Sequence, residues 1–168
     1  MEAALTLLDS QVPNGYESAS QPFRRPGWGF VVYGDARPAG SKRAFKHPHT
    51  GKIVVTEMAK GAKPWRADVQ AAALEVFRGP LLTGPLAVTF TIYRPRPAGH
   101  LGTGRNAGTV KDSAPAYPTT RPDVLKLARA LEDALQGIVY RDDSQIVDEF
   151  LHKRYGEPAR AEVSITPL

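Results

Sequence analysis

The sequence predicts an α+β fold: a mixed or antiparallel sheet with two helices packed on one face. Apolar residues recur at helical spacing in two segments, residues 63–78 and 122–136. Five other segments are rich in β-branched and aromatic residues, as strands are. Their order along the chain is β-β-α-β-α-β-β. Helices and strands therefore do not alternate strictly, and the pattern favours an α+β arrangement of one domain.

The first quarter of the chain divides into a tail and two strands. Residues 1–27 are rich in Ser, Pro, Gly and Gln and hold few large apolar side chains, so we expect a disordered N-terminal tail. The folded domain then spans residues 28–168. Residues 29–34 form a first strand. A basic loop over 42–50 leads through the Gly51 turn into a second strand at 52–56.

The middle of the chain contains a helix, a strand and a long loop. The helix at 63–78 ends at Gly79-Pro80, and the strand at 86–93 alternates apolar and polar residues. Residues 98–120 are rich in Gly, Pro, Ser and Thr, which predicts a mobile loop. Two further strands follow the second helix. The apolar face of the first helix consists of Trp65, Val69, Ala72, Ala73, Val76 and Phe77.

The second helix is bounded by clear start and stop residues. Pro122 suits a first helical position, with Thr119 or Thr120 as the cap, and Gly137 suits the left-handed residue after the last turn. A helix of about 14 residues is roughly 20 Å long. Six extended steps from Gly137 cover a similar length. If the chain doubles back, Asp143 therefore arrives beside Asp123.

Converging carboxylates repel one another unless a cation neutralises them. Mg²⁺ binds a few carboxylates, several waters and phosphate oxygens, so Asp123, Asp142 and Asp143 on a basic protein suggest phosphodiester chemistry. A simpler interpretation remains open: Asp123 is only a first-turn residue favoured by the helix dipole, and residues 142–144 form a solvated turn.

The charge is distributed unevenly along the chain. Residues 36–110 hold twelve Lys or Arg against three Asp or Glu, a balance of +9, whereas residues 111–168 hold eight against ten, a balance of −2. The first part suits the binding of polyanionic DNA, and the second carries the acidic residues. A solvated basic face without a ligand is the alternative.

Composition excludes several classes of protein. The chain of 168 residues has no cysteine, so neither a disulfide framework nor a Cys-based zinc site is available. No apolar run reaches membrane-spanning length, and the short apolar patch at 3–8 lacks the basic start of a secretion signal. We therefore expect a cytoplasmic protein without membrane association, in a bacterial or phage-infected cell.

The second half of the chain resembles a known family. The residues concerned are Arg121-Pro122-Asp123, Asp133-Ala134-Leu135, Gly137, Tyr140-Arg141-Asp142-Asp143-Ser144-Gln145-Ile146-Val147 and Lys153-Arg154-Tyr155. They are similar to the C-terminal core of the RusA family of Holliday junction resolvases. The resemblance is close over residues 119–155 and looser upstream. It implies a small dimeric endonuclease, often phage-borne, that acts in recombination and repair and cuts four-way DNA junctions with Mg²⁺, for which Mn²⁺ is an expected substitute.

The resemblance also assigns roles to individual residues. Asp123 matches the first metal-binding aspartate, Asp143 the catalytic aspartate of the Asp-Asp pair, and Arg129 the place of an important lysine. The family's second catalytic carboxylate is replaced here by Leu125, which cannot hold a metal. Glu132 lies on the same helical face, but about 10 Å further along the axis. Asp142 is then the expected third ligand, with an exposed turn carboxylate as the alternative.

Two functions follow as hypotheses. In the first, the protein is a homodimeric endonuclease that binds Mg²⁺ and cleaves branched DNA, with Arg129 stabilising charge on the phosphate. In the second, the loss of the carboxylate at Leu125 leaves a catalytically impaired protein that binds branched DNA. An RNA-binding module is disfavoured, since no aromatic RNA-binding pattern is present. The expected DNA-binding residues are Lys42, Arg43, Lys46, Arg94, Arg96, Arg105 and Lys126.

Overall fold

The computed structural model of the protein describes residues 27–39, 42–57 and 61–168. The predicted tail at 1–27 falls almost entirely outside these residues. The strands are β1 (Trp28–Tyr33), β2 (Lys42–Lys46), β3 (Ile53–Glu57), β4 (Leu86–Arg94), β5 (Ile146–Tyr155) and β6 (Arg160–Pro167), and the α-helices are α1 (Ala62–Val76) and α2 (Val124–Leu135). The predicted α+β class is confirmed.

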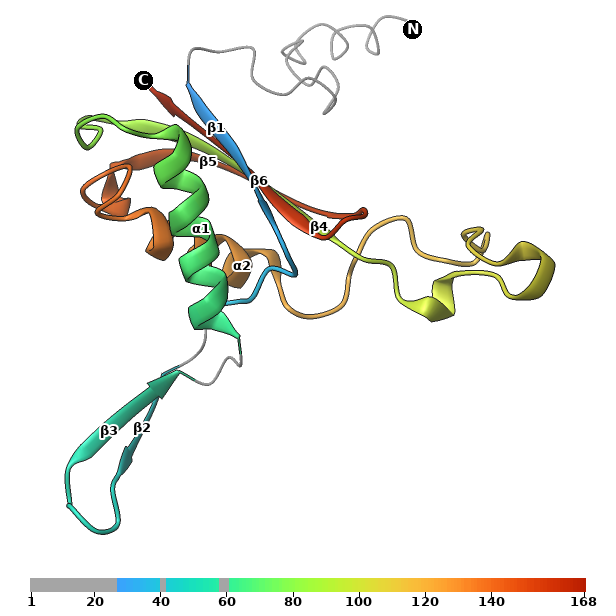
Figure 1. The fold of residues 1–168 in the computed structure, drawn as a ribbon, viewed down its shortest axis with the longest axis horizontal. Coiled ribbons are helices and arrows are strands. Elements are labelled where there is room, and N and C mark those ends of the chain that lie inside the picture. The colour runs from blue at the N-terminus through green and yellow to red at the C-terminus, as the bar shows by residue number, and fades with distance from the viewer. Residues whose placement is uncertain (1–26, 40–41, 58–60) are drawn as a thin grey trace, which may run out of the picture.

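Four strands form the central sheet in the order β1-β6-β4-β5 (Figure 1). β6 pairs antiparallel with both β1 and β4, whereas β4 and β5 pair in parallel. The parallel pair requires a crossover from the end of β4 to the start of β5, and α2 lies within that crossover. β5 is consequently an edge strand, and α2 runs beside it.

The core lies on one face of the sheet. Side chains of β4 alternate strictly, with Leu86, Val88, Phe90 and Ile92 buried and the residues between them half-buried. Such alternation places every second residue on the same face. Both helices turn their apolar stripes toward that face, which explains why the sequence period predicted them correctly. The buried helix residues are Trp65, Val69 and Ala73 of α1 and Leu127, Ala128, Leu131, Ala134 and Leu135 of α2.

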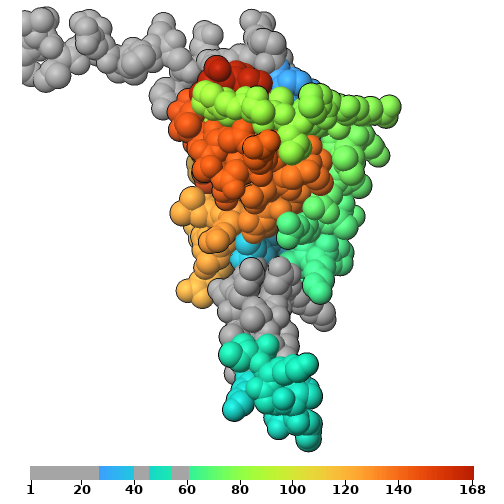
Figure 2. All heavy atoms as spheres, turned by 90° about the vertical axis from the view of Figure 1, so that its left-hand side faces the viewer, coloured from blue at the N-terminus to red at the C-terminus, as the bar shows by residue number. Residues whose placement is uncertain are grey.

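A separate hairpin of β2 and β3 projects from the body of the protein (Figures 1 and 2). The prediction of a loop at 42–50 was wrong for residues 42–46, because these pair with β3 over five residues on each strand. Only 47–52 form the turn, which is closed by bonds from the His47 amide to the Lys52 carbonyl and from the Gly51 amide to the His47 carbonyl. At this tip Lys46, Lys52 and Ile53 are exposed.

The segment between β4 and α2 forms a second projection (Figure 1). An irregular mobile loop was predicted here, but the structure shows short 3₁₀ turns at Ala98–His100 and Gly104–Asn106. The Gly102 amide donates to the Thr109 carbonyl, and the Lys111 amide donates to the His100 carbonyl. These backbone bonds fold the segment on itself, which Gly- and Pro-rich composition alone did not reveal. No helix in the described part of the chain is long and apolar enough to cross a membrane.

Candidate active site at the two ends of α2

Asp123 is the N-cap of α2. Its Oδ1 accepts a hydrogen bond of 2.9 Å from the Lys126 amide, and its backbone is extended. The predicted cap at Thr119 or Thr120 and the helical position of Pro122 were wrong, since the helix begins at Val124. Asp is among the best N-cap residues, so it takes the position itself. The aspartate expected to bind metal thus has a second, structural role.

Both carboxylate oxygens of Asp123 contact the same residue. Besides the amide bond to Oδ1, the Lys126 ammonium lies 3.1 Å from Oδ2. The pKa of Asp123 is below its usual value. The main cause is the hydrogen bond from the Lys126 amide, and the next is the hydrogen bond from the Lys126 side chain. Lys126, expected to bind DNA, therefore serves as the counter-ion of Asp123. A carboxylate in this state is ionised and available to a cation at neutral pH.

The chain does not return along α2 as predicted. A tight turn closes after the helix: Gly137 takes a left-handed φ of 77°, and its amide donates to the Tyr140 carbonyl. Tyr140 is fully buried, and its hydroxyl donates to the Glu132 carbonyl at 3.1 Å. This burial draws residues 137–140 against the C-terminal end of α2. Asp143 therefore stays at that end and does not reach Asp123.

Asp142 is engaged in a local cap. It is the N-cap of a 3₁₀ turn at Asp143–Gln145, where Oδ1 accepts from the Ser144 amide at 3.0 Å. Its Oδ2 accepts from the side-chain Nε2 of Gln136 at 3.3 Å. Hydrogen bonds to Ser144 lower the pKa of Asp142. This 3₁₀ turn fixes the position of Asp143, which is exposed just before β5.

Three carboxylates gather at the C-terminal end of α2. Glu132 of α2 lies against Glu149 of β5, with Asp143 close by. Burial, followed by the hydrogen bond and the charge of Glu149 and then by the charge of Asp143, raises the pKa of Glu132 to about 7. Such crowding is what a divalent cation neutralises. Within one chain, however, these three carboxylates do not form a group that could hold a metal ion by themselves, as far as the described residues show.

Glu149 is the residue that the sequence analysis missed. It pairs with Val88, whose side chain is buried, so Glu149 shares the helix-facing side of the sheet. The sequence of 146–155 does not alternate between apolar and polar residues, so the orientation of Glu149 follows only from the β4–β5 register. Glu132 lies near Asp143, whereas its sequence position suggested only a substitute near Leu125.

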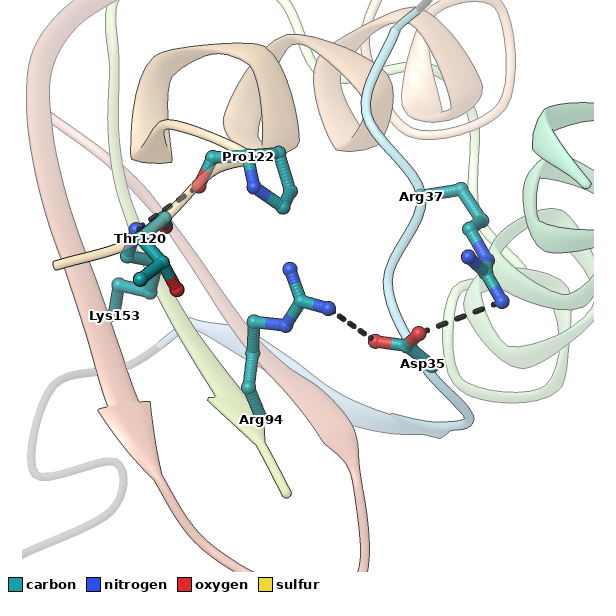
Figure 3. Close-up of polar contacts among 6 residues, drawn as sticks. All are labelled: Asp35, Arg37, Arg94, Thr120, Pro122 and Lys153. Atoms are coloured by element: carbon teal, nitrogen blue, oxygen red, sulfur yellow. Dashed lines mark hydrogen bonds and ion pairs between the residues drawn. The ribbon is translucent and has the colours of Figure 1, made fainter. Parts of the chain in front are cut away.

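Basic side chains surround the other end of α2 (Figure 3). Asp35 follows β1 and forms ion pairs with Arg37 at 3.4 Å and with Arg94, the last residue of β4, at 3.3 Å. Nearby, the Lys153 ammonium of β5 donates to the carbonyls of Thr120 and Pro122. The Asp123 end of the helix is thus rich in cations, in contrast to the acidic end.

The other expected site residues are spread over the surface. Arg129 and Leu125 are exposed on α2, the latter to 67%. Arg96 lies 4.4 Å from the centre of the Tyr155 ring and donates to the Pro115 carbonyl. Lys46 and Arg105 are exposed on the two projections. The side chains of Lys42 and Arg43 lie outside the described atoms.

A single chain does not bring the predicted metal ligands together. Glu132 lies nine residue steps after Asp123 in the helix, which corresponds to roughly 13 Å along the axis. Asp143 lies with Glu132, so Asp123 and Asp143 are at opposite ends of α2. Among residues 27–39, 42–57 and 61–168, no group of three or more His, Asp or Glu side chains in one chain could hold a metal ion.

Comparison with known proteins places the chain in a family. Residues 35–166 match the family described as endodeoxyribonuclease RusA. The chain is also 33% identical over 140 residues to the uncharacterized protein YqaN of Bacillus subtilis (strain 168), an alignment that covers 81% of this chain and 93% of YqaN. The family match includes α2, β5 and all the carboxylates described above, and the chain belongs to the RusA endodeoxyribonuclease family.

Proposed function

We propose that the protein is a Mg²⁺-dependent endonuclease that resolves four-way and other branched DNA as a homodimer. The observation that carries this proposal is the placement of Asp123 and Asp143 at opposite ends of one helix in a RusA-family chain. Each end alone is an incomplete site. Two copies related by a twofold axis complete both.

The geometry of α2 explains why two copies are needed. When two α2 helices lie antiparallel across a twofold axis, the N-terminal end of one faces the C-terminal end of the other. Asp123 of one copy then approaches Asp143 and Glu132 of its partner. The arrangement generates two equivalent sites about one helix length apart. Two sites are what symmetric cutting of a four-way junction requires.

Exposed apolar residues support this pairing. Leu125 in the first turn of α2 is 67% exposed, and Val147 near the start of the edge strand β5 is 60% exposed. These residues belong to the two elements that carry the carboxylates. Burying them between copies stabilises a dimer by about 25 cal/mol per Å² of apolar surface. Leu125 would then pack in the interface between the copies, at the position where the family has a metal-binding carboxylate.

The charges of the residues indicate the role of each in cleavage. Asp123, Asp143 and Glu132 would hold the cation, with Asp142 fixing the turn that presents Asp143. A bound Mg²⁺ supplies a Lewis acid for the phosphate and lowers the pKa of a water nucleophile. Arg129, exposed on α2, would stabilise negative charge on the phosphate. The basic projections would grip the DNA arms.

The proposal is tested with a labelled synthetic four-way junction. Purified protein should introduce paired nicks near the crossover in Mg²⁺ or Mn²⁺, leave linear duplex of the same sequence nearly intact, and do neither in EDTA. Asp143→Asn should keep junction affinity while losing cleavage, because it removes a ligand charge and little phosphate contact. Cleavage of linear duplex at the same rate would contradict junction selectivity.

A second function is favoured by the ion pair at the N-terminus of α2. Lys126 neutralises Asp123 and Leu125 adds no carboxylate, so this end carries less negative charge than two carboxylates would give. A branched-DNA-binding protein without cleavage is the consequence if the cation is not held. Tight junction binding with no nicks in either metal identifies that function.

A further inference from the structure

Lys153 forms an unusual link between the edge strand and the start of α2. Its Nζ donates two hydrogen bonds of 2.9 Å, one to the Thr120 carbonyl and one to the Pro122 carbonyl (Figure 3). Both acceptors are backbone groups in the short segment that leads into Asp123. Hydrogen bonds from an ammonium group are stronger than those between neutral groups.

The acceptors explain what the link controls. The Pro122 carbonyl belongs to the same peptide unit as the Asp123 amide, so fixing that carbonyl fixes the backbone on which the Asp123 side chain stands. The Thr120 bond holds the preceding turn of chain. On the helix side the carboxylate is held by the Lys126 amide at 2.9 Å. Asp123 is therefore clamped between β5 on one side and α2 on the other.

β5 connects this clamp to the acidic end of the site. Glu149 lies four residues before Lys153 on the same strand and the same face, a distance of roughly 13 Å. The strand is held along its length by β4. A single rigid element thus sets the position of Asp123 relative to Glu149, Glu132 and Asp143. Correct spacing between the two ends matters because each completes a site with the opposite end of another copy.

We propose that Lys153 is a positioning residue for the metal-binding carboxylate Asp123, acting through the carbonyls of Thr120 and Pro122. The proposal rests on the proposed function for the role of Asp123. Lys153 itself touches neither the cation nor the scissile phosphate. Groups that orient a metal ligand from behind contribute about 10- to 100-fold to metal affinity or activity. That range sets the expected size of the effect.

The test compares Lys153→Met and Lys153→Arg with the wild-type protein. Lys153→Met keeps the aliphatic stem but removes the donors, so the Mg²⁺ concentration for half-maximal junction cleavage should rise about tenfold or more. Direct titration of Mn²⁺ by electron paramagnetic resonance should show the same loss of affinity. Junction affinity in Ca²⁺ should change less than threefold. Lys153→Arg, which can donate to two carbonyls, should recover most of the metal affinity.

Lys111→Met is the matched control. It removes the same side chain, in the projecting segment twelve residues before Asp123, and one 2.9 Å bond from an ammonium to a backbone carbonyl, that of Gly99. It should leave the Mn²⁺ affinity measured without DNA unchanged. Equal metal affinity in Lys153→Met and wild-type protein would overturn the proposal, as would an equal shift in Lys111→Met.

Hydrogen exchange separates this proposal from the proposed function. The amides of Lys126 and Leu127, which donate to the side chain and the carbonyl of Asp123, should exchange faster in Lys153→Met than in wild-type protein, whether or not the protein cleaves DNA. If wild-type protein neither binds Mn²⁺ nor cleaves junctions, the proposed function fails while this measurement still reports on the clamp. Unchanged exchange at these amides would show that Lys153 does not position Asp123.

Discussion

Asp123 combines two roles that different substitutions can separate. Its Oδ1 caps α2, and its charge is expected to hold a cation. Asn caps a helix about as well as Asp, whereas Ala does not cap. The position thus offers a matched pair of variants at one residue.

We expect Asp123→Asn to abolish cleavage while leaving the melting temperature nearly unchanged. Asp123→Ala should also abolish cleavage but lower the melting temperature by roughly 2–4 °C, since the cap is lost. Thermal melting and junction cleavage on the same preparations check both statements. Wild-type cleavage by Asp123→Asn would remove the residue from the site.

Glu132 gives the site a pH dependence. Its pKa lies near 7, well above the ordinary value of 4.5, so the folded state binds this proton more tightly than the unfolded state does. Ionisation of Glu132 therefore lowers stability as pH rises from about 4.5 to 7, and the loss is complete above that range. Glu132→Gln should raise the melting temperature by a few degrees at pH 8 and leave it unchanged at pH 4.

The same reasoning predicts how Mg²⁺ acts on stability. A cation shared by Glu132 and Asp143 of one copy and Asp123 of its partner should stabilise the wild-type protein at pH 8 and much less at pH 5, where Glu132 is protonated. Differential scanning fluorimetry with and without Mg²⁺ measures this. An equal rise in melting temperature on adding Mg²⁺ at both pH values would show that the cation binds elsewhere.

At the scale of elements, periodicity predicted most of the fold correctly. α1, α2, β1, β4 and β6 follow apolar patterns set by burial against one face of a sheet, whereas no residue of β5 is fully buried. β2 was missed because its five residues include three basic ones and none of the β-branched residues by which β3 was predicted. The return after α2 was misjudged because the burial of Tyr140 is a tertiary effect. The partnership of Glu132 with Glu149 depends on the pairing of β4 with β5, which spacing alone does not specify.

The β2–β3 hairpin is predicted to grip DNA. Replacing Lys42, Arg43 and Lys46 by Ala should weaken junction binding and reduce the slope of log affinity against log salt by up to roughly 3 units. The hairpin projects from the body, so the melting temperature should stay within a few degrees. Fluorescence anisotropy over a salt series measures the slope.

Arg78→Ala is the control for this experiment, since Arg78 is an exposed cation just beyond the opposite end of α1. The slope of log junction affinity against log salt for this variant should match that of the wild-type protein. Identical slopes for the triple variant would show that the hairpin does not contact phosphates.

At the scale of the whole molecule, the proposed cleavage requires two chains that share each site. One chain separates Asp123 from Asp143 by about the length of α2, and the described residues of one chain form no metal-binding group. Basic projections extend from the same body that carries these carboxylates (Figure 1). A dimer would present two sites and four projections to a four-armed substrate.

Mixing two inactive variants tests whether Asp123 of one copy and Asp143 of its partner share a site. Asp123→Asn and Asp143→Asn proteins should each fail to cut a four-way junction. After subunit exchange, each mixed dimer would contain one site with both wild-type aspartates and one site with neither. We therefore predict that the mixture regains cleavage, at about a quarter of the wild-type number of sites, and yields single nicks instead of paired ones. A mixture as inactive as its components, despite verified subunit exchange, would contradict the shared site.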